Sequence, residues 1–208
     1  MNGAAVTAPL SFVLATANPD KAREIVAIVY AVAGDAVELR PRPPEVPDVE
    51  ETGDTLEENA RLKAQALVDA TGLAAIADDT GLEVDALGGA PGVHSARFAG
   101  PEASYDDNVA KLLLELDSVL LSGDAGRRAR FRTVAVACFP DGGEIVAHGL
   151  VEGAIATERR GSGGFGYDPL FLPDGGGGRT YAEMSLAEKS ALSHRGKAFR
   201  ALAAGLLA

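Results

Sequence analysis

The chain alternates short apolar runs with segments in which apolar residues recur every three or four positions. The run from Leu10 to Ala15 predicts a buried strand. The segment that begins at Pro19 predicts a helix that ends near Gly34. The same reasoning predicts further strands at 36–39, 73–77, 82–87, 130–139 and 144–151, helices at 54–71 and 102–117, a capped helical start at Ser185 and a last helix to Leu206. Early alternation followed by a hairpin indicates an α/β protein with a mixed sheet.

Size and charge narrow the function classes. With 208 residues and a hydrophobic content of 47%, the chain is expected to form one globular domain, or two small lobes sharing a core. The net charge of −11 argues against a nucleic acid or an anionic membrane as partner. A small anionic ligand in a local basic pocket stays compatible with it.

The lone cysteine and the apolar runs bear on location. Cys138 lies in an apolar run and is interpreted as a buried hydrophobic residue in a reducing compartment. The first residues lack the basic start of a secretory signal, and no run reaches the roughly 18 apolar residues of a membrane span. We therefore expect a cytoplasmic protein without a membrane partner.

A first candidate site lies between the first strand and the first helix. The junction runs Thr16-Ala17-Asn18-Pro19-Asp20-Lys21. A helix start binds anions through free backbone N–H groups, and Lys21 adds a full charge. The alternative is a plain strand–helix turn with an exposed lysine, since no Walker-type glycine pattern is present.

A second candidate lies on the helix predicted at 54–71. Asn59 and Lys63 are one turn apart and fall inside its apolar stripe. A lysine directed inward either extends back to solvent or meets an anion. The neighbouring acid-rich loop and Asp pair favour a ligand.

A third candidate is the acidic pair Asp78-Asp79, followed by Thr80, at the end of a predicted apolar strand. Adjacent side chains in an extended segment point to opposite sides, so one carboxylate can bind a metal or orient water while the other anchors the loop. Glu50 and Glu51 offer further oxygen ligands, and hard oxygen donors favour Mg²⁺ or Mn²⁺ over zinc. An acidic turn is the structural alternative.

Two more candidates follow in the C-terminal third. Glycines surround an aromatic in Gly163-Gly164-Phe165-Gly166-Tyr167-Asp168-Pro169, which allows close approach to a flat ligand and stacking on its ring. Lys189 and the run Ser193-His194-Arg195-Gly196 lie near the start of the last helix, where Ser193 is a candidate cap. A packed glycine turn and a solvated helix end are the alternatives.

Taken in order, these motifs resemble the non-canonical purine nucleoside triphosphate pyrophosphatases, also called inosine triphosphatases or XTP/dITP diphosphatases. The resemblance extends from about residue 11 to the last helix. It rests on these segments: Leu14 to Lys21, Glu51 to Gly53, Glu57 to Ala60, Lys63-Ala64, Ile76 to Leu82, Leu87 to Val93, Ser95 to Arg97, Gly163 to Pro169 and Glu188 to Gly196. Each motif alone is common, but their shared order is specific.

The resemblance implies an elongated, twisted mixed sheet flanked by helices, with two lobes and a nucleotide cleft between them. It implies a flexible tail at 1–9, a single catalytic domain at 10–208 and a homodimer. The implied reaction converts ITP, dITP and XTP to the monophosphate and pyrophosphate with Mg²⁺, which cleanses the nucleotide pool. The alternatives are a pyrophosphatase for modified pyrimidine triphosphates and a nucleotide-binding module without turnover.

Residue roles also come from the resemblance. Thr16, Asn18, Lys21 and Lys63 contact the phosphates. Asp79 accepts a proton and binds metal beside Asp78, an acid of the pair Glu50-Glu51 completes the metal site, and Thr80 lies against the nucleotide. The base pocket is assigned to Phe165, Gly166, Tyr167, Asp168, Lys189, His194 and Arg195. Three positions depart from the family pattern: Ala17 stands where glycine is common, Thr80 where serine is common and Leu56 where an aromatic is common.

Overall fold

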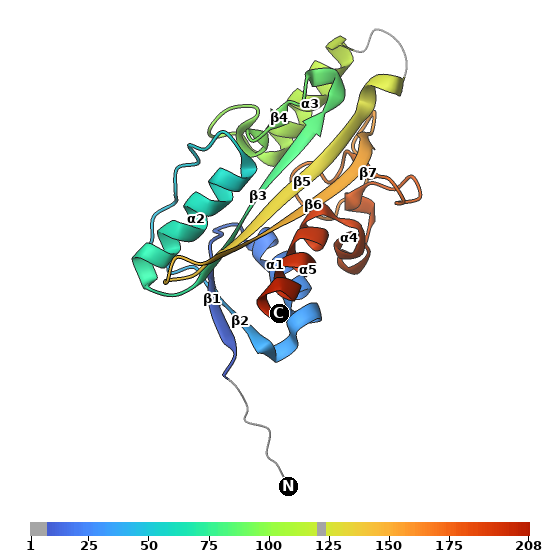
Figure 1. Ribbon diagram of the computed structural model, residues 1–208. Coiled ribbons are helices and arrows are strands. Elements are labelled where there is room, and N and C mark those ends of the chain that lie inside the picture. Colours follow the sequence, from blue (N-terminus) through green and yellow to red (C-terminus); the bar gives the residue numbers. More distant parts are fainter. Residues whose placement is uncertain (1–7, 120–123) are drawn as a thin grey trace.

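A seven-stranded sheet runs the length of the molecule in the computed structural model, which describes residues 8–119 and 124–208 (Figure 1). Its strand order is β2-β1-β3-β5-β6-β7, and the short β4 pairs with β3. The bounds of the strands are β1 Leu10–Leu14, β2 Val37–Pro41, β3 Ala75–Val84, β4 Pro91–Gly92, β5 Arg128–Cys138, β6 Glu144–Ile155 and β7 Phe171–Pro173. Because β1 is parallel to β2 and β3 while the other pairs are antiparallel, the expected mixed sheet is confirmed.

Five α-helices accompany the sheet in the described residues: α1 Pro19–Ala33, α2 Leu56–Thr71, α3 Tyr105–Val119, α4 Leu186–Leu192 and α5 His194–Leu206. The predicted caps are confirmed at Ser185, which forms a capping box with Glu188, and at Ser193, which accepts the Gly196 N–H. The helix predicted at 54–71 is capped by Thr55, which forms a capping box with Glu58. None of these helices is long and apolar enough to cross a membrane. The predicted tail lies mostly at residues 1–7, outside the described part of the chain.

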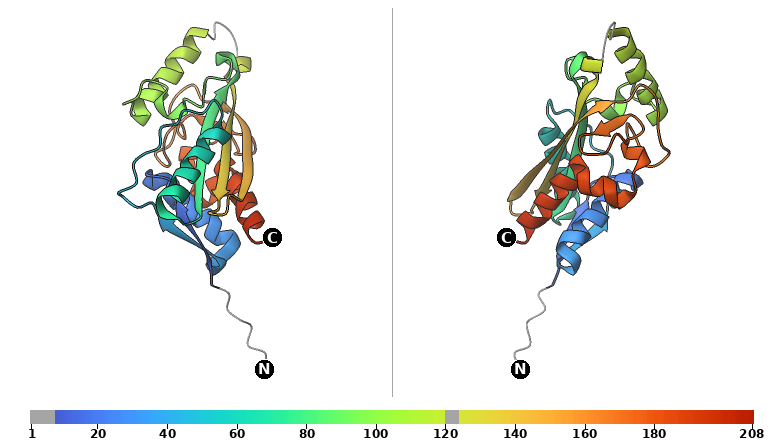
Figure 2. Two further views of the ribbon diagram at one scale, coloured as in Figure 1. Left: turned by 60° about the vertical axis from the view of Figure 1, so that its left-hand side comes forward. Right: turned by 90° about the vertical axis from the view of Figure 1, so that its right-hand side faces the viewer.

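The alternation of side chains along β3 and β5 creates two different faces. Helices α1 and α5 pack on one face, and α2 packs on the other (Figure 2). On the α1–α5 face, one apolar cluster surrounds Ile76 and Phe199, and a second surrounds Leu82 and Leu112 nearer to α3. The central strands β3, β5 and β6 therefore serve two cores on this face, one toward each end of the sheet, and β3 and β5 also contribute to a third core under α2.

Two sequence predictions about strands are wrong. The strands expected at 73–77 and 82–87 are one strand, β3, so the Asp pair lies within it. Antiparallel pairing with Ala135 and Val134 of β5 keeps the backbone extended through Asp78 and Asp79, although aspartate itself disfavours strands. The short strand β7 was not among the predicted strands.

The edge of β3 beside β1 is open at its centre. β1 pairs with β3 only up to Ile76, and β4 begins to pair at Leu82. The segment between them, 77–81, lies where these two short strands leave a gap. Candidate chemistry therefore sits at the carboxyl end of β1, as is usual for ligand sites in open α/β sheets.

Candidate active site

The two central carboxylates face opposite sides of the sheet, as predicted from strand geometry. Asp79 faces α2, where its Oδ1 accepts a hydrogen bond from Lys63 Nζ at 2.8 Å. Asp78 faces α1 and α5, where its Oδ2 lies 3.8 Å from Lys21 Nζ and 3.4 Å from Arg195 Nη2. Each carboxylate is buried and paired with its own cations.

These surroundings shift the pKa values of the two carboxyl groups in opposite directions. Burial, together with the neighbouring Glu51, raises the pKa of Asp79 despite the Lys63 ammonium. Burial alone would raise the pKa of Asp78 too, but the charges of Lys21 and Arg195 outweigh it and hold that pKa well below its usual value. Asp79 is therefore the better proton acceptor, and Asp78 stays ionised near neutral pH.

The acid-rich loop brings one glutamate of the predicted pair into the site. Glu51 accepts from Lys63 Nζ at 2.9 Å and from Arg97 Nη1 at 2.9 Å, whereas Glu50 is exposed. Asn59, expected to bind substrate, lies fully buried beneath this loop and accepts the Gly53 N–H at 2.8 Å. Its position supports a role in holding the loop.

The turn between β1 and α1 is organised by its cap. The Asn18 Oδ1 accepts the N–H groups of Asp20 and Lys21, so these two donors are not free for an anion. The side chain of Asp20 pairs with Arg23 instead of facing the cleft. The turn thus offers a ligand the Lys21 ammonium and the polar groups of Thr16 rather than a row of open backbone donors.

The glycine-rich loop is closed around Asp168. This buried carboxylate accepts from the Phe165 N–H at 2.8 Å and from Lys189 Nζ at 2.6 Å. Gly164 has a φ of +69°, and a Cβ there would lie 2.0 Å from Asp168, so the loop requires glycine at this position. The Tyr167 hydroxyl donates to the Ser95 carbonyl at 3.0 Å, which fixes the loop from beneath.

The start of α5 is buried rather than solvated. His194 stacks on Phe131 with ring centroids 4.4 Å apart. Burial and the nearby charges of Arg195 and Lys189 hold the pKa of His194 well below its usual value, so the ring is neutral. Its Nδ1 and the Nε of Arg195 are buried without a hydrogen-bond partner in the described residues. Since buried polar groups are normally bonded, these atoms indicate a polar ligand.

Two adjoining hollows collect most of the predicted residues. One, of about 220 Å³, is polar and is lined by Lys21, Lys63, Glu51 and Asp78 among others. The other, of about 200 Å³, is lined mainly by apolar and aromatic groups and includes Phe165 and Arg195. Asn18 and Lys21 line both, so a ligand with a charged end and a flat end fits across them.

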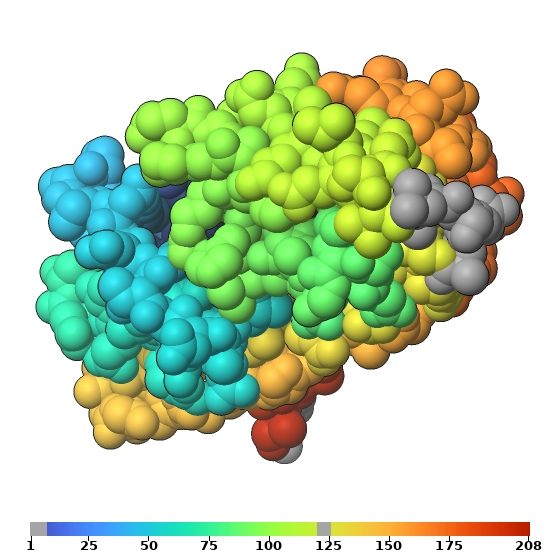
Figure 3. All heavy atoms as spheres, turned by 90° about the horizontal axis from the view of Figure 1, so that it is seen from above, coloured from blue at the N-terminus to red at the C-terminus, as the bar shows by residue number. Residues whose placement is uncertain are grey.

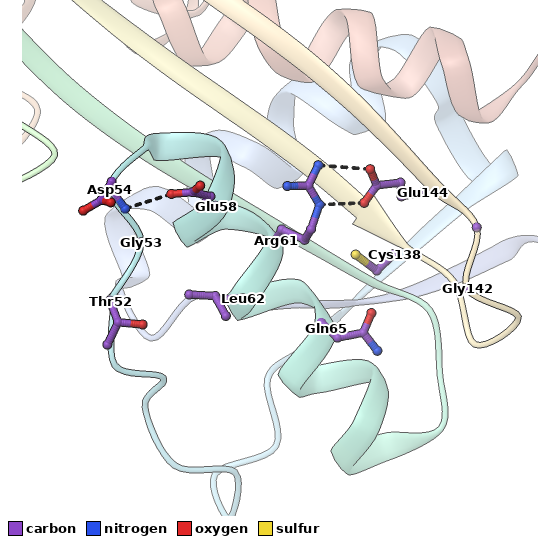
Figure 4. A pocket seen from close by; sticks show the side chains of 11 residues that line it. Thr52, Gly53, Asp54, Glu58, Arg61, Leu62, Gln65, Cys138, Gly142 and Glu144 are labelled. Atoms are coloured by element: carbon purple, nitrogen blue, oxygen red, sulfur yellow. Dashed lines mark hydrogen bonds and ion pairs between the residues drawn. The ribbon is translucent and has the colours of Figure 1, made fainter.

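The surface shows the opening of this region. Viewed from above, atoms of the N-terminal segment are visible at the bottom of a gap between the acid-rich loop and the segment near residue 100 (Figure 3). A separate hollow of about 500 Å³ lies between α2 and the β5–β6 hairpin (Figure 4). There the Arg61 guanidinium already binds Glu144 through two nitrogens, and the predicted site residues do not line it.

The donor set fits a magnesium ion bound together with a phosphate ligand. Asp79 Oδ2 is buried and has no hydrogen-bond partner in the described residues, and Glu51 shares Lys63 with it. No group of three or more acidic, histidine or cysteine side chains gathers for a metal within residues 8–119 and 124–208. Mg²⁺ commonly uses one or two carboxylates and completes its shell with waters and substrate phosphates, which matches this pair.

Three residues of the site escaped sequence reasoning. Glu24 is buried and accepts from Lys189 at 2.5 Å and from Arg195 at 2.6 Å. Its place next to Ile25 on the apolar stripe of α1 was the available signal. Arg97 and Tyr105 reach the site from segments after β4. Arg97 belongs to the motif Ser95 to Arg97 and Tyr105 lies on the apolar stripe of the helix predicted at 102–117, but neither signal assigned them to the site.

The chain is similar to several known proteins along most of its length. The dITP/XTP pyrophosphatase of Methylococcus capsulatus is 50% identical over 200 residues, covering 94% of this chain and 96% of the relative. The dITP/XTP pyrophosphatase of Streptomyces coelicolor is 48% identical over 197 residues, covering 91% and 94%. The structure of a HAM1 protein from Coxiella burnetii matches with a TM-score of 0.84 and 39% identity, covering 95% of this chain and 98% of that one.

A family model described as the Ham1 family matches residues 12–205, which includes every strand and helix listed above except the first two residues of β1 and the last residue of α5. The matching region thus spans both hollows and the acidic pair between them. The chain belongs to the Ham1 family.

Proposed function

We propose that this protein is a nucleoside triphosphate pyrophosphatase that converts non-canonical purine nucleotides (ITP, dITP and XTP) to the monophosphate and pyrophosphate. The observation that carries the proposal is the junction of a charged hollow with an aromatic one at Asn18 and Lys21. A triphosphate fits the first and a base fits the second. The names of the relatives support the same activity.

The charged hollow binds the triphosphate. Lys21 and Lys63 place positive charge there, and the Thr16 hydroxyl adds a polar contact. In the free protein these lysines are held by Asp78, Asp79 and Glu51, so they are preorganised before the ligand arrives. Preorganised charge is the main source of catalysis in phosphoryl transfer.

Asp79 accepts the proton of the attacking water. Its raised pKa and its unpaired Oδ2 suit it to that role. The water oxygen bonds to the α-phosphorus, the bond from that phosphorus to the bridging oxygen breaks, and pyrophosphate leaves. Glu51 and Asp79 hold Mg²⁺, for which Mn²⁺ is a possible substitute. When bound, this ion supplies positive charge to the phosphate oxygens.

The aromatic hollow selects the base. Phe165 provides a stacking surface, the Arg195 Nε is a donor without a partner in the described residues, and we assign a second donor to a backbone N–H of the loop from Gly164 to Asp168. The 6-oxo group of hypoxanthine or xanthine accepts hydrogen bonds, whereas the 6-amino group of adenine donates. Adenine would leave these donors unpaired, and each buried unpaired donor costs roughly 1–3 kcal/mol of binding free energy.

The test is a panel of nucleotides. The protein is incubated with Mg²⁺ and ITP, dITP, XTP, ATP, GTP and modified pyrimidine triphosphates, and pyrophosphate is measured. We expect ITP, dITP and XTP to exceed ATP by about a hundredfold or more in kcat/KM. Preferred hydrolysis of a pyrimidine triphosphate, or no hydrolysis of any nucleotide, would reject the proposal.

We also propose that the protein is a homodimer. Light scattering should then give about twice the chain mass of 21.3 kDa.

A further inference from the structure

Tyr105 lies where the two hollows meet. It is the first residue of α3, and its hydroxyl accepts a hydrogen bond from Asn18 Nδ2 at 2.6 Å. Its ring centroid is 6.0 Å from that of Phe165, and it lines the aromatic hollow. One side chain thus contacts both the turn beside the charged hollow and the loop that forms the base pocket.

The backbone around Tyr105 is firmly held. Asn108 is 2% exposed, accepts the Ala99 N–H at 2.7 Å and donates to the Ala96 carbonyl at 3.0 Å. Ser104 and Asp107 exchange hydrogen bonds at the helix start. These contacts fix the first turn of α3, so the backbone of Tyr105 holds its side chain in a defined position.

The side chain itself is not used for packing. Its sequence position places it on the stripe that continues through Val109 and Leu112, yet Tyr105 is 44% exposed while those two are buried. Its hydroxyl accepts from Asn18, and within residues 8–119 and 124–208 no acceptor takes its own proton. A half-exposed ring with a free donor, facing an aromatic hollow, is suited to a ligand that is flat and polar.

The space between the rings is small without a ligand. The aromatic hollow is about 200 Å³, below the roughly 300–1,000 Å³ of typical ligand pockets. A base that stacks between Tyr105 and Phe165 requires these two rings, whose centroids are 6.0 Å apart, to separate, which stretches or breaks the bond to Asn18. The released Asn18 amide then becomes a donor beside the charged hollow.

We propose that Tyr105 is a nucleotide-contacting residue that holds the purine nucleoside against Phe165, and that its bond to Asn18 closes the cleft until a nucleotide enters. This inference rests on the proposed function and deepens it. Stacking on an aromatic ring tolerates any base, so Tyr105 contributes affinity rather than the choice between hypoxanthine and adenine.

The test measures binding without turnover. The Kd of inosine monophosphate is measured by calorimetry in the absence of Mg²⁺ for the wild type, Tyr105→Ala and Tyr105→Phe. Tyr30→Ala is the matched control, because Tyr30 is 64% exposed on α1. We expect Tyr105→Ala to weaken binding about tenfold or more, and Tyr105→Phe, which keeps the ring, to stay within about threefold of the wild type.

A second ligand separates affinity from base choice. The Kd of adenosine monophosphate should rise by the same factor in Tyr105→Ala, so the ratio of the Kd values of the two nucleotides stays unchanged. Equal binding of inosine monophosphate by Tyr105→Ala and the wild type, an equal loss in Tyr30→Ala, or no binding by the wild type would overturn the proposal. Pyrophosphate release by the wild type is a separate readout, so failure of the proposed function is recognised independently.

Discussion

At the scale of single residues, Asp78 and Asp79 show how neighbours in sequence acquire different chemistry. The strand directs one toward α1 and α5 and the other toward α2. Asp78 is surrounded by cations and stays ionised, while Asp79 shares one lysine with Glu51 and is more easily protonated. The division of labour between anchor and proton acceptor therefore follows from the two-residue period of a strand.

Asp79→Asn should retain the fold and lose about 10²–10⁴-fold in pyrophosphate release, because the amide cannot accept the proton of the attacking water. Asp69→Asn is the control, since Asp69 lies on α2 and accepts only from Gln65 among the described contacts. Steady-state kinetics with thermal melting measures both effects. Undiminished hydrolysis by Asp79→Asn would refute its role.

Asp78→Asn should destabilise the protein by about 3 kcal/mol at pH 7, because Lys21 and Arg195 lose their buried partner. The folded-state pKa of Asp78 lies below the unfolded value, so its stabilisation is fully present above about pH 4 and is lost as the pH falls further. The difference in unfolding free energy between wild type and variant should therefore shrink below about pH 4.

Urea unfolding from pH 7 to pH 3 measures this difference. Asp35→Asn, on an exposed turn, is the control, because it shows how much the unfolding free energy changes when an exposed aspartate is replaced. A gap between wild type and Asp78→Asn that stays constant over the whole range would mean that the local charges do not stabilise the Asp78 carboxylate.

At the scale of elements, the loop before α2 is held from three sides. The Thr55–Glu58 capping box fixes its end, Asn59 binds Gly53 from below, and Arg97 binds both the carboxylate and the carbonyl of Glu51. The last contact comes from the segment after β4. Glu51 is thus positioned by a residue far away in sequence.

Arg97→Met should raise the Mg²⁺ concentration for half-maximal activity about tenfold or more, because partners that orient a metal ligand commonly matter by that amount. Its side chain is 35% exposed, so thermal stability should change little. Arg40→Met, which removes an exposed pair with Glu38, is the matched control. An unchanged Mg²⁺ requirement would show that Arg97 does not position Glu51.

How far the sequence predicts this site depends on whether each feature is local. The caps at Thr55 and Ser193 were predictable because capping is decided within a few residues. The continuity of β3 was not, since its pairing partner β5 lies about fifty residues away. Glu24 was missed for a related reason: its cations, Lys189 and Arg195, come from the other end of the chain.

At the scale of the whole molecule, the part of the site on the α1–α5 face of the sheet lies between two cores. One core surrounds Phe199, and the other surrounds Leu112. Residues of the site occupy the stretch of β3 between them, with Thr80 and Asp78 between Ile76 and Leu82. A loss of packing in either core should therefore also disturb the site, because β3 belongs to both cores and carries the site residues.

Leu112→Ala should lower the free energy of unfolding by about 2–5 kcal/mol, because this fully buried side chain leaves a cavity in the core beneath α3. Leu114→Ala, on the same helix but 72% exposed, should have little effect. Unfolding of Leu112→Ala followed by circular dichroism and by nucleotide binding should show a single coincident transition. Two separated transitions would mean that the cores unfold independently.

The strands β3, β5 and β6 that pass through both cores also decide how the protein can be divided. A fragment that ends after α3 would contain β3 but would lack β5, which pairs with its other edge, and β6, which pairs with β5 and completes the cores. The complementary fragment would contain β5 and β6 without β1 or α1. A split version of this protein would therefore regain activity only when both fragments are present together, and such a pair would report the proximity of whatever proteins were fused to them.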